Sequence, residues 1–196
     1  GTYSTAKKRL ALEAVIYNAR GKRTARKVKK IKLKGTDVNH CSVVIRPSRV
    51  YMWTVDDPYM YTVKVAIKDE NGKILAEGGS GFGIVSRSLS ENRGLVLNGR
   101  SVKLEGAVVQ PDLGILGMES TRAAEEYKLS RIKAIGYNAV RYEGVPTEAA
   151  LDTLDKLGLM AEIDLFGVWA QGEFPYDGHV GFAENKLYDC RRFVRQ

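Results

Sequence analysis

The stretch Lys133-Ala-Ile-Gly-Tyr-Asn-Ala-Val-Arg141 most constrains the fold, because it joins the end of a helix to a short strand through one glycine. Apolar residues at helical spacing predict a helix over 122–135, and Gly136 stands where the residue after a helix adopts positive φ at low cost. Residues 138–140 are short and apolar, which is typical of a buried strand, and Arg141 follows at its C-terminal end. In parallel α/β sheets and barrels, ligands bind at that end of the strands.

The same strand–helix unit occurs on both sides of this stretch. Residues 102–109 predict a strand, and residues 147–157 predict a second helix, with Thr147 as N-cap and Gly158 as its stop. A strand over 159–166 and a third helix over 181–195 follow. The order β-α-β-α-β-α predicts a parallel sheet with right-handed crossovers.

The first predicted helix has an apolar stripe and a charged side. Its inward candidates are Ala123, Tyr127, Ile132 and Ile135. We interpret Glu119, Glu125 and Glu126 as a solvated helix face.

Residues 1–90 show the short alternating runs of an antiparallel sheet. Strands are predicted over 10–17, 24–34, 40–45, 61–68, 74–77 and 81–85, with turn signals between them. Such spacing predicts an antiparallel sandwich. A further hairpin over 95–104 turns at Asn98-Gly99. We therefore expect a sandwich domain over 1–90 and a second domain over 91–196.

The charge distribution agrees with two domains. Formal net charge is +8, but residues 1–50 hold 14 Lys/Arg against 2 Asp/Glu, whereas the remaining residues hold 17 against 21. A basic half is compatible with a polyanion surface, or with a soluble strand face that matches an acidic partner. No nucleic-acid motif accompanies the charge, so we expect no nucleic-acid partner.

The sequence shows no metal, cofactor or membrane pattern. Cys41 and Cys190 lie in different predicted domains, and His40 and His179 are isolated, so we expect unpaired thiols, no metal site and no cofactor. No apolar run approaches the roughly 20 residues of a membrane helix. The N-terminus carries no apolar signal core.

Four stretches together resemble one enzyme family. They are Trp53-Thr-Val-Asp-Asp-Pro-Tyr-Met-Tyr-Thr-Val63, Gly81-Phe-Gly-Ile84, Leu97-Asn-Gly-Arg-Ser-Val-Lys-Leu-Glu-Gly106 and a barrel-like part made of the segments 112–117, 136–141 and 151–159. In order and spacing they are similar to glycoside hydrolase family 2, whose best-known members are β-galactosidases. The resemblance implies an Ig-like antiparallel β-sandwich followed by a partial (β/α)8 TIM barrel of about three units.

The implied activity is retaining hydrolysis of a β-glycosidic bond, β-galactosidase-like. A retaining glycosidase uses two carboxyl groups about 5–5.5 Å apart. The family places the first in an Asn-Glu pair, and no such pair occurs in this chain. We therefore expect no catalytic residue in this chain, which by itself is inactive. The alternative is a non-catalytic carbohydrate-binding or scaffold module. The expected partner is a carbohydrate substrate, and the resemblance is compatible with a periplasmic or extracellular location.

The resemblance also implies where sugar contacts lie. The substrate-binding candidates are Arg141, Asp164, Trp169, Gln110 and Asp112. Arg141 either orients a carboxylate or a sugar hydroxyl, or forms a structural ion pair. Trp169 either stacks on a sugar ring or packs at the base of a loop. Gln110-Pro111 stands where the family often has His-His, and Asp164 where it usually has Glu, so a sugar other than galactose stays open.

An incomplete barrel has two sheet edges, which a closed barrel lacks. It also leaves inward side chains uncovered, and we expect Val140 and Ile163 among them. Exposed edges are templates for pairing with another chain. We expect self-association through this half-barrel, or coverage of the edges by the 170–181 segment.

Overall fold

The computed structural model describes residues 9–32, 40–110, 112, 114, 117, 121–166 and 179–195. The chain divides into two compact units, Gly1–Val102 and Lys103–Gln196. Each unit is described by itself below. The expected boundary after residue 90 stays a prediction.

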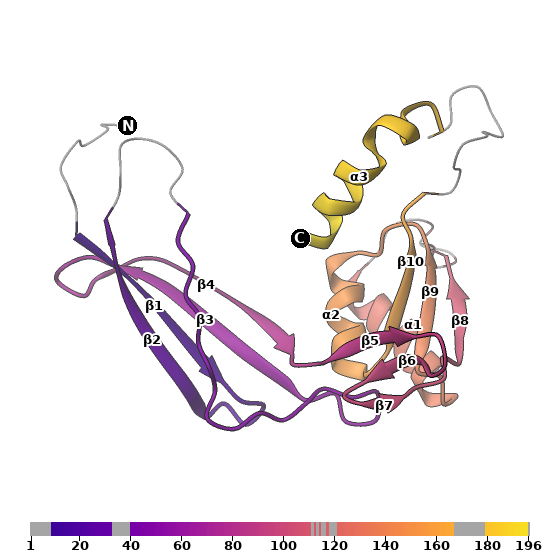
Figure 1. The fold of residues 1–196 in the computed structure, drawn as a ribbon, viewed down its shortest axis with the longest axis horizontal. Helices are drawn as coiled ribbons and strands as arrows, with labels where there is room; N and C mark the ends of the chain where they lie inside the picture. The colour runs from indigo at the N-terminus through magenta and orange to yellow at the C-terminus, as the bar shows by residue number, and fades with distance from the viewer. Residues whose placement is uncertain are drawn as a thin grey trace. The chain divides into compact units, whose positions relative to one another are not determined.

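The first unit is built on a four-stranded antiparallel sheet (Figure 1). Its strands are β1 (Arg9–Tyr17), β2 (Arg23–Lys32), β3 (Met60–Lys68) and β4 (Ile74–Gly83), in the order β2-β1-β3-β4. Two of its turns share one construction, in which a side-chain oxygen of Asn18 or Asp69 accepts two backbone N–H groups. The glycines of these turns, Gly21 and Gly72, have φ of 72° and 81°.

One face of this sheet holds an apolar and aromatic core. Leu10, Ala14 and Ile16 of β1 are buried, together with Tyr61 of β3 and Trp53. An aromatic row runs through Tyr51, Tyr59, Tyr61 and Phe82, with neighbouring ring centroids 5.0, 5.1 and 5.7 Å apart. Gly83 leaves room for Trp53, since a Cβ there would lie 2.9 Å from the indole side chain. The motif residues Trp53, Tyr59 and Tyr61 thus have a packing role.

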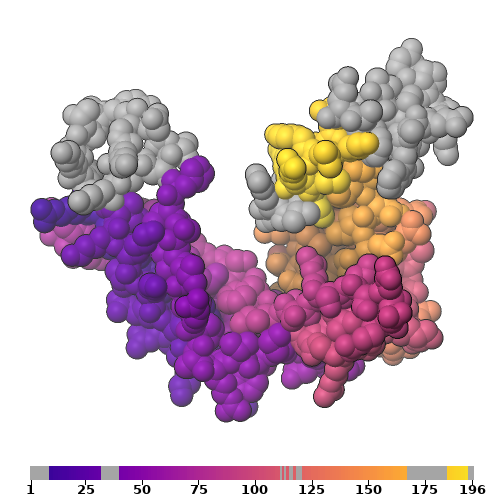
Figure 2. Space-filling view, in the orientation of Figure 1, coloured from indigo at the N-terminus to yellow at the C-terminus, as the bar shows by residue number. Residues whose placement is uncertain are grey.

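A small antiparallel sheet completes the first unit. It contains β5 (Arg87–Ser90), β6 (Gly94–Leu97) and β7 (Arg100–Ser101). The predicted turn is confirmed, because Asn98 and Gly99 have φ of 50° and 82°. The Asn98 side chain donates to the carbonyl of Trp53 at 2.8 Å. Figure 2 shows the surface of this part of the chain in magenta to pink. Leu89 of β5 is exposed.

The strand predicted over 40–45 is wrong. The structure describes residues 40–50 without strand pairing. The β-branched residues Val43, Val44 and Ile45 favour extended backbone, but a strand also needs a neighbour that completes its ladder. Within the described residues, β2 pairs with β1 alone. A local contact remains, in which Lys29 donates to the carbonyl of Ser42 at 2.9 Å.

The second unit contains the predicted succession of strands and helices. In chain order it has β8 (Gly106–Val109), α1 (Arg122–Ala134), β9 (Ala139–Glu143), α2 (Glu148–Leu157), β10 (Met160–Asp164) and α3 (His179–Arg195). The three strands form a parallel sheet in the order β10-β9-β8 (Figure 1). The predicted parallel pairing is confirmed.

The caps of α2 are those that the sequence predicts. The Thr147 hydroxyl accepts from the backbone N–H of Ala150, and Gly158 ends the helix in the left-handed region. At the end of α1, Gly136 has φ of 100°. These local signals fix where each helix stops and the next strand begins, and so they place Arg141 within β9.

Helices α1 and α2 cover one face of the parallel sheet. The buried cluster there is Val109, Leu129, Val140, Tyr142, Ala150, Leu154 and Leu159. The prediction that Val140 points away from the helices is therefore wrong. Ile163 pairs with Tyr142 in register and shares its face. Because successive side chains alternate across a strand, Arg141 points to the opposite face.

The predicted inner side of α1 is also partly wrong. Tyr127 and Ile135 are 70% and 72% exposed, whereas Glu125 is 4% exposed. Glu125 forms an ion pair with Lys128 at 3.2 Å. Paired charges can occupy a buried position that hydropathy assigns to solvent. The helix therefore turns a side centred on Leu129 toward the sheet.

Candidate functional site

The polar side chains at the carboxyl ends of β8, β9 and β10 form the candidate site. Arg141 of β9 pairs in register with Val108 of β8 and Glu162 of β10. Two residues further along, Glu143 pairs with Asp164. We call the sheet face that carries Arg141, Glu143, Glu162 and Asp164 the charged face. It lies opposite the face that α1 and α2 cover.

Arg141 and Asp164 form the central contact of the charged face. Asp164 Oδ2 accepts from Arg141 Nε at 3.0 Å and from Nη2 at 2.7 Å. Glu162 Oε1 lies 3.8 Å from Arg141 Nε. The hydrogen bond to Asp164 raises the pKa of Arg141 first, and the charges of Asp164, Glu162 and Glu143 add to the rise. The guanidinium is therefore permanently charged and already occupied on one side by a carboxylate.

Gln110 and Glu143 form a second contact on neighbouring strands. Gln110 Nε2 donates to Glu143 Oε2 at 3.0 Å. Glu143 and Glu162 were not among the residues that the sequence singled out. The sequence nevertheless indicates their position, because residues two apart on a strand lie on the same face of the sheet. Glu143 therefore lies on the face of Arg141, and Glu162 lies on the face of Asp164.

The structure brings three of the five sequence candidates to the charged face. Arg141, Asp164 and Gln110 lie there through the contacts above. Asp112 is exposed, and among the described residues no hydrogen bond or ion pair joins it to the others. Trp169 lies outside the described residues. The roles of all five in substrate binding stay predictions.

Under β9, on the helix-covered face, lies a buried polar cluster. Tyr142 is 1% exposed, and burial raises the pKa of its hydroxyl, with the charge of Glu125 adding to the rise. Lys128 Nζ lies 5.9 Å from the centre of the Tyr142 ring. These contacts hold α1 against β9 and so fix the backbone that carries Arg141 and Glu143.

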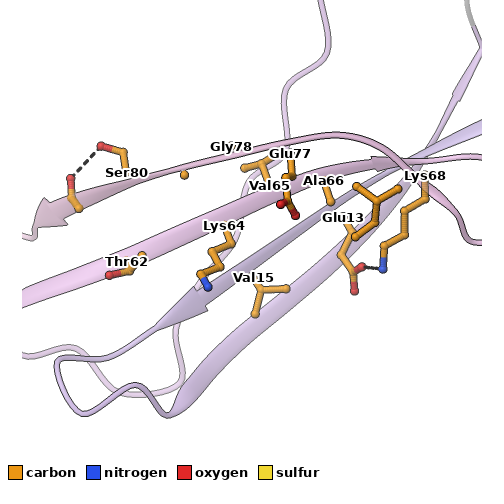
Figure 3. A pocket seen from close by; sticks show the side chains of 13 residues that line it. Glu13, Val15, Thr62, Lys64, Val65, Ala66, Lys68, Glu77, Gly78 and Ser80 are labelled. Carbon is orange, nitrogen blue, oxygen red and sulfur yellow. Dashed lines mark hydrogen bonds and ion pairs between the residues drawn. The ribbon is translucent and has the colours of Figure 1, made fainter.

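A groove of about 630 Å³ lies on the four-stranded sheet of the first unit (Figure 3). Gly79 lines it, and a Cβ there would lie 2.6 Å from the carbonyl oxygen of Val63. Glu13 is ion-paired with Lys68 and Arg26. Hydrogen bonds from Lys68 and then Arg26 hold the pKa of Glu13 below its ordinary value. Since both partners neutralise Glu13, we assign this triad to sheet stability.

Other classes of site find little support in the described part of the chain. Within it, no three His, Cys, Asp or Glu residues lie close enough to hold a metal ion. Cys41 and Cys190 are free, the first exposed and the second half-buried. The helices that the structure describes are too short or too polar to cross a membrane.

Comparison with known proteins gives one consistent result. The model of the family "Glycosyl hydrolases family 2" matches residues 2–84. The chain is 30% identical over 144 residues to the β-galactosidase BoGH2A of Bacteroides ovatus, and 25% identical over 139 residues to a β-glucuronidase of Bacteroides fragilis. These matches cover 73% and 70% of this chain but only 17% and 19% of the relatives.

A solved structure matches over nearly the whole chain. It is a glycosyl hydrolase family 2 member from Bacteroides cellulosilyticus, with a TM-score of 0.87 and 28% identity. The match covers 96% of this chain and 24% of that protein. The chain therefore spans about a quarter or less of the length of these relatives.

Proposed function

Since this chain belongs to family 2 of the glycosyl hydrolases, we propose that it forms part of a retaining β-glycosidase. The observation that carries the proposal is the Arg141–Asp164 pair at the carboxyl ends of parallel strands. That end of the strands carries the active site in β/α barrels. The names of the relatives support hydrolysis of a β-glycoside as the reaction.

The proposal includes the finer architecture. The four-stranded antiparallel sheet belongs to an Ig-like sandwich domain over 1–90, and β8 to β10 with their helices are the first units of a (β/α)8 barrel over 91–196. The support is the parallel order β10-β9-β8 and the cover of α1 and α2 on one face. In a closed barrel the helices lie on the outside of the sheet, and the charged face lines the inside of the barrel.

The residues of the charged face bind and orient, and the reacting carboxyl pair comes from outside this chain. Retaining hydrolysis needs one carboxyl as acid/base and one as nucleophile. Asp164 accepts two hydrogen bonds from Arg141, and Glu143 accepts one from Gln110. Both are thus engaged in fixed contacts. Arg141, which is 51% exposed, has donors left to orient a sugar hydroxyl or the nucleophile carboxylate.

Hydrolysis of 4-nitrophenyl β-glycosides tests the proposal. The complete protein that contains this chain is expected to release nitrophenol, and the purified 196-residue chain is expected to release none. Turnover by this chain alone, abolished by a substitution within it, would contradict the placement of the catalytic pair. An inactive complete protein that still binds β-glycosides would favour a non-catalytic carbohydrate-binding or scaffold module.

A further inference from the structure

The chain contains two Asn-Gly pairs, and both lie in turns of the first unit. Asn71-Gly72 lies between β3 and β4, and Asn98-Gly99 lies between β6 and β7. In such a pair the glycine nitrogen can attack the side-chain amide of the asparagine, because glycine has no Cβ that blocks the approach. The two pairs therefore offer the same chemistry, and their surroundings decide which of them reacts.

The side chain of Asn98 is held at both of its polar atoms. Its Nδ2 donates to the carbonyl of Trp53 at 2.8 Å, and its Oδ1 accepts from the backbone N–H of Ser86 at 2.9 Å. These two hydrogen bonds must open before the amide can turn toward the nitrogen of Gly99. The contacts that position this turn thus also protect Asn98.

Asn71 lies in an exposed turn, and its side chain makes no hydrogen bond within the described residues. Its backbone N–H donates to Asp69 Oδ1 at 2.9 Å, which holds the main chain and leaves the amide free. The attacking nitrogen of Gly72 donates to the carbonyl of Asp69 at 3.1 Å, so one exposed hydrogen bond must open. The space around it is open, since a Cβ on Gly72 would meet nothing within 4 Å.

We propose that Asn71 is a site of spontaneous deamidation in the folded protein, with water as the co-reactant. The Gly72 nitrogen forms a bond to Cγ of Asn71, and Nδ2 leaves as ammonia together with the proton of the attacking nitrogen. Water then opens the resulting cyclic imide at one of its two carbonyl carbons. The product is aspartate, or isoaspartate when water attacks the backbone carbonyl of Asn71. Either product adds one negative charge to the turn.

Isoaspartate loosens the turn, because it adds one methylene group to the main chain between residues 71 and 72. The turn depends on Asp69, whose Oδ1 accepts from the backbone N–H groups of Asn71 and Lys73, both at 2.9 Å. A longer main chain shifts Lys73 relative to Asp69 and strains these hydrogen bonds. The new carboxylate also lies beside the acidic residues Asp69 and Glu70, and like charges repel. The adjoining ends of β3 and β4 therefore fray in the modified chain.

The expected difference in rate follows from the hydrogen bonds that must open at each site. A typical intramolecular hydrogen bond changes an equilibrium by about 2- to 10-fold. Asn98 must release two side-chain bonds, one of them part-buried, whereas the Asn71 site opens one exposed bond. We therefore expect Asn71 to react at least about 3-fold faster than Asn98.

The experiment incubates the purified chain at mildly alkaline pH in water labelled with heavy oxygen, and peptide mass spectrometry follows both sites. The peptide with Asn71 is expected to gain the label faster than the peptide with Asn98. The same incubation in concentrated urea is the control, because unfolding removes the contacts and should make the two rates nearly equal. Asn71→Gln should abolish the labelling of the first peptide, because its longer side chain forms the ring less readily.

Two results in the folded chain would overturn the site. One is labelling of Asn98 at a rate equal to or above that of Asn71. The other is an unlabelled Asn71 under conditions in which the chain in urea becomes labelled, because the fold would then protect it.

Hydrogen exchange of backbone amides tests the effect on the turn. Peptides of β3 and β4 should lose protection in the isoaspartate form, while those of β9 should not. Equal protection of β3 and β4 in the two forms would overturn the loosening of this hairpin.

Discussion

Replacing Gly106 by alanine tests how tightly β8 must lie against β9. A Cβ built on Gly106 would lie 2.2 Å from the carbonyl oxygen and 2.7 Å from the carbonyl carbon of Ala139. Both are backbone atoms of a strand that α1 and α2 hold in place, so no rotamer change relieves the clash. The strands must separate by about 1 Å to restore an ordinary contact distance.

The expected cost comes from two opposing effects. Overpacking a close contact costs about 1–3 kcal/mol, whereas Gly→Ala in unstrained backbone stabilises by about 0.4–1 kcal/mol through the unfolded state. Gly106→Ala should therefore destabilise the second unit by about 1–2 kcal/mol. A shift of about 1 Å would also stretch the 3.0 Å contact between Gln110 and Glu143 beyond hydrogen-bond range.

Hydrogen exchange of backbone amides, followed by mass spectrometry, measures this effect locally. Peptides that cover β8 and β9 should lose protection in Gly106→Ala, while those of β1 and β3 should not. Gly78→Ala is the matched control, because its Cβ would meet nothing within 4 Å and its φ is ordinary. Protection in β8 and β9 equal to that of the wild type would refute the close-approach argument.

Three further predictions follow from the described contacts. Glu13→Gln should lower stability in urea by about 1 kcal/mol at pH 7, since Arg26 is half exposed and screening limits the loss. Because the pKa of Glu13 is lowered in the folded state, its contribution to the free energy of unfolding is present above pH 4.5 and disappears as the pH falls through the lower folded value. A loss of stability in Glu13→Gln that is equal at pH 3 and pH 7 would contradict this. Tyr142→Phe should leave thermal stability unchanged or raise it, because the buried hydroxyl has no hydrogen-bond partner within the described residues; a fall of more than about 1 kcal/mol in urea unfolding would show a missed partner. The isolated chain should self-associate through the edges of β8 and β10, which have no second neighbour within the described residues, and a strict monomer in sedimentation velocity across micromolar concentrations would argue against it.

Local signals made much of the second unit predictable. Thr147, Gly136 and Gly158 act through the backbone of a few residues, so the ends of α1 and α2 could be read without tertiary information. The position of Arg141 near the end of a parallel strand followed from those ends. The contact with Asp164 is consistent with two neighbouring parallel strands in register.

The side to which each residue of a strand or helix points, and its burial, were harder to predict. Both depend on which other elements pack against each side of that strand or helix. Val140 was expected to point away from the helices, yet it lies in one buried cluster with Leu129 of α1 and Ala150 of α2. The same alternation sends Glu143 and Glu162 to the charged face, which the sequence reading missed. In α1 a buried position carries the charged residue Glu125, which pairs with Lys128, so the residue types there do not indicate burial. Each of these outcomes needs three-dimensional packing, which composition and period do not specify.

The most direct measurement of the central claim compares two arginines in the complete protein. Arg141 and Arg122 are 51% and 52% exposed, and each pairs with an aspartate, Asp164 and Asp152, at 2.7 and 3.1 Å. Only Arg141 lies at the carboxyl ends of the parallel strands. Arg141→Ala should lower kcat/KM for a β-glycoside by roughly 100-fold, as loss of one positioned donor does, while Arg122→Ala should stay within about 2-fold of the wild type. Equal activities of the two variants, with both folded, would contradict the assignment of the charged face as part of a glycosidase site.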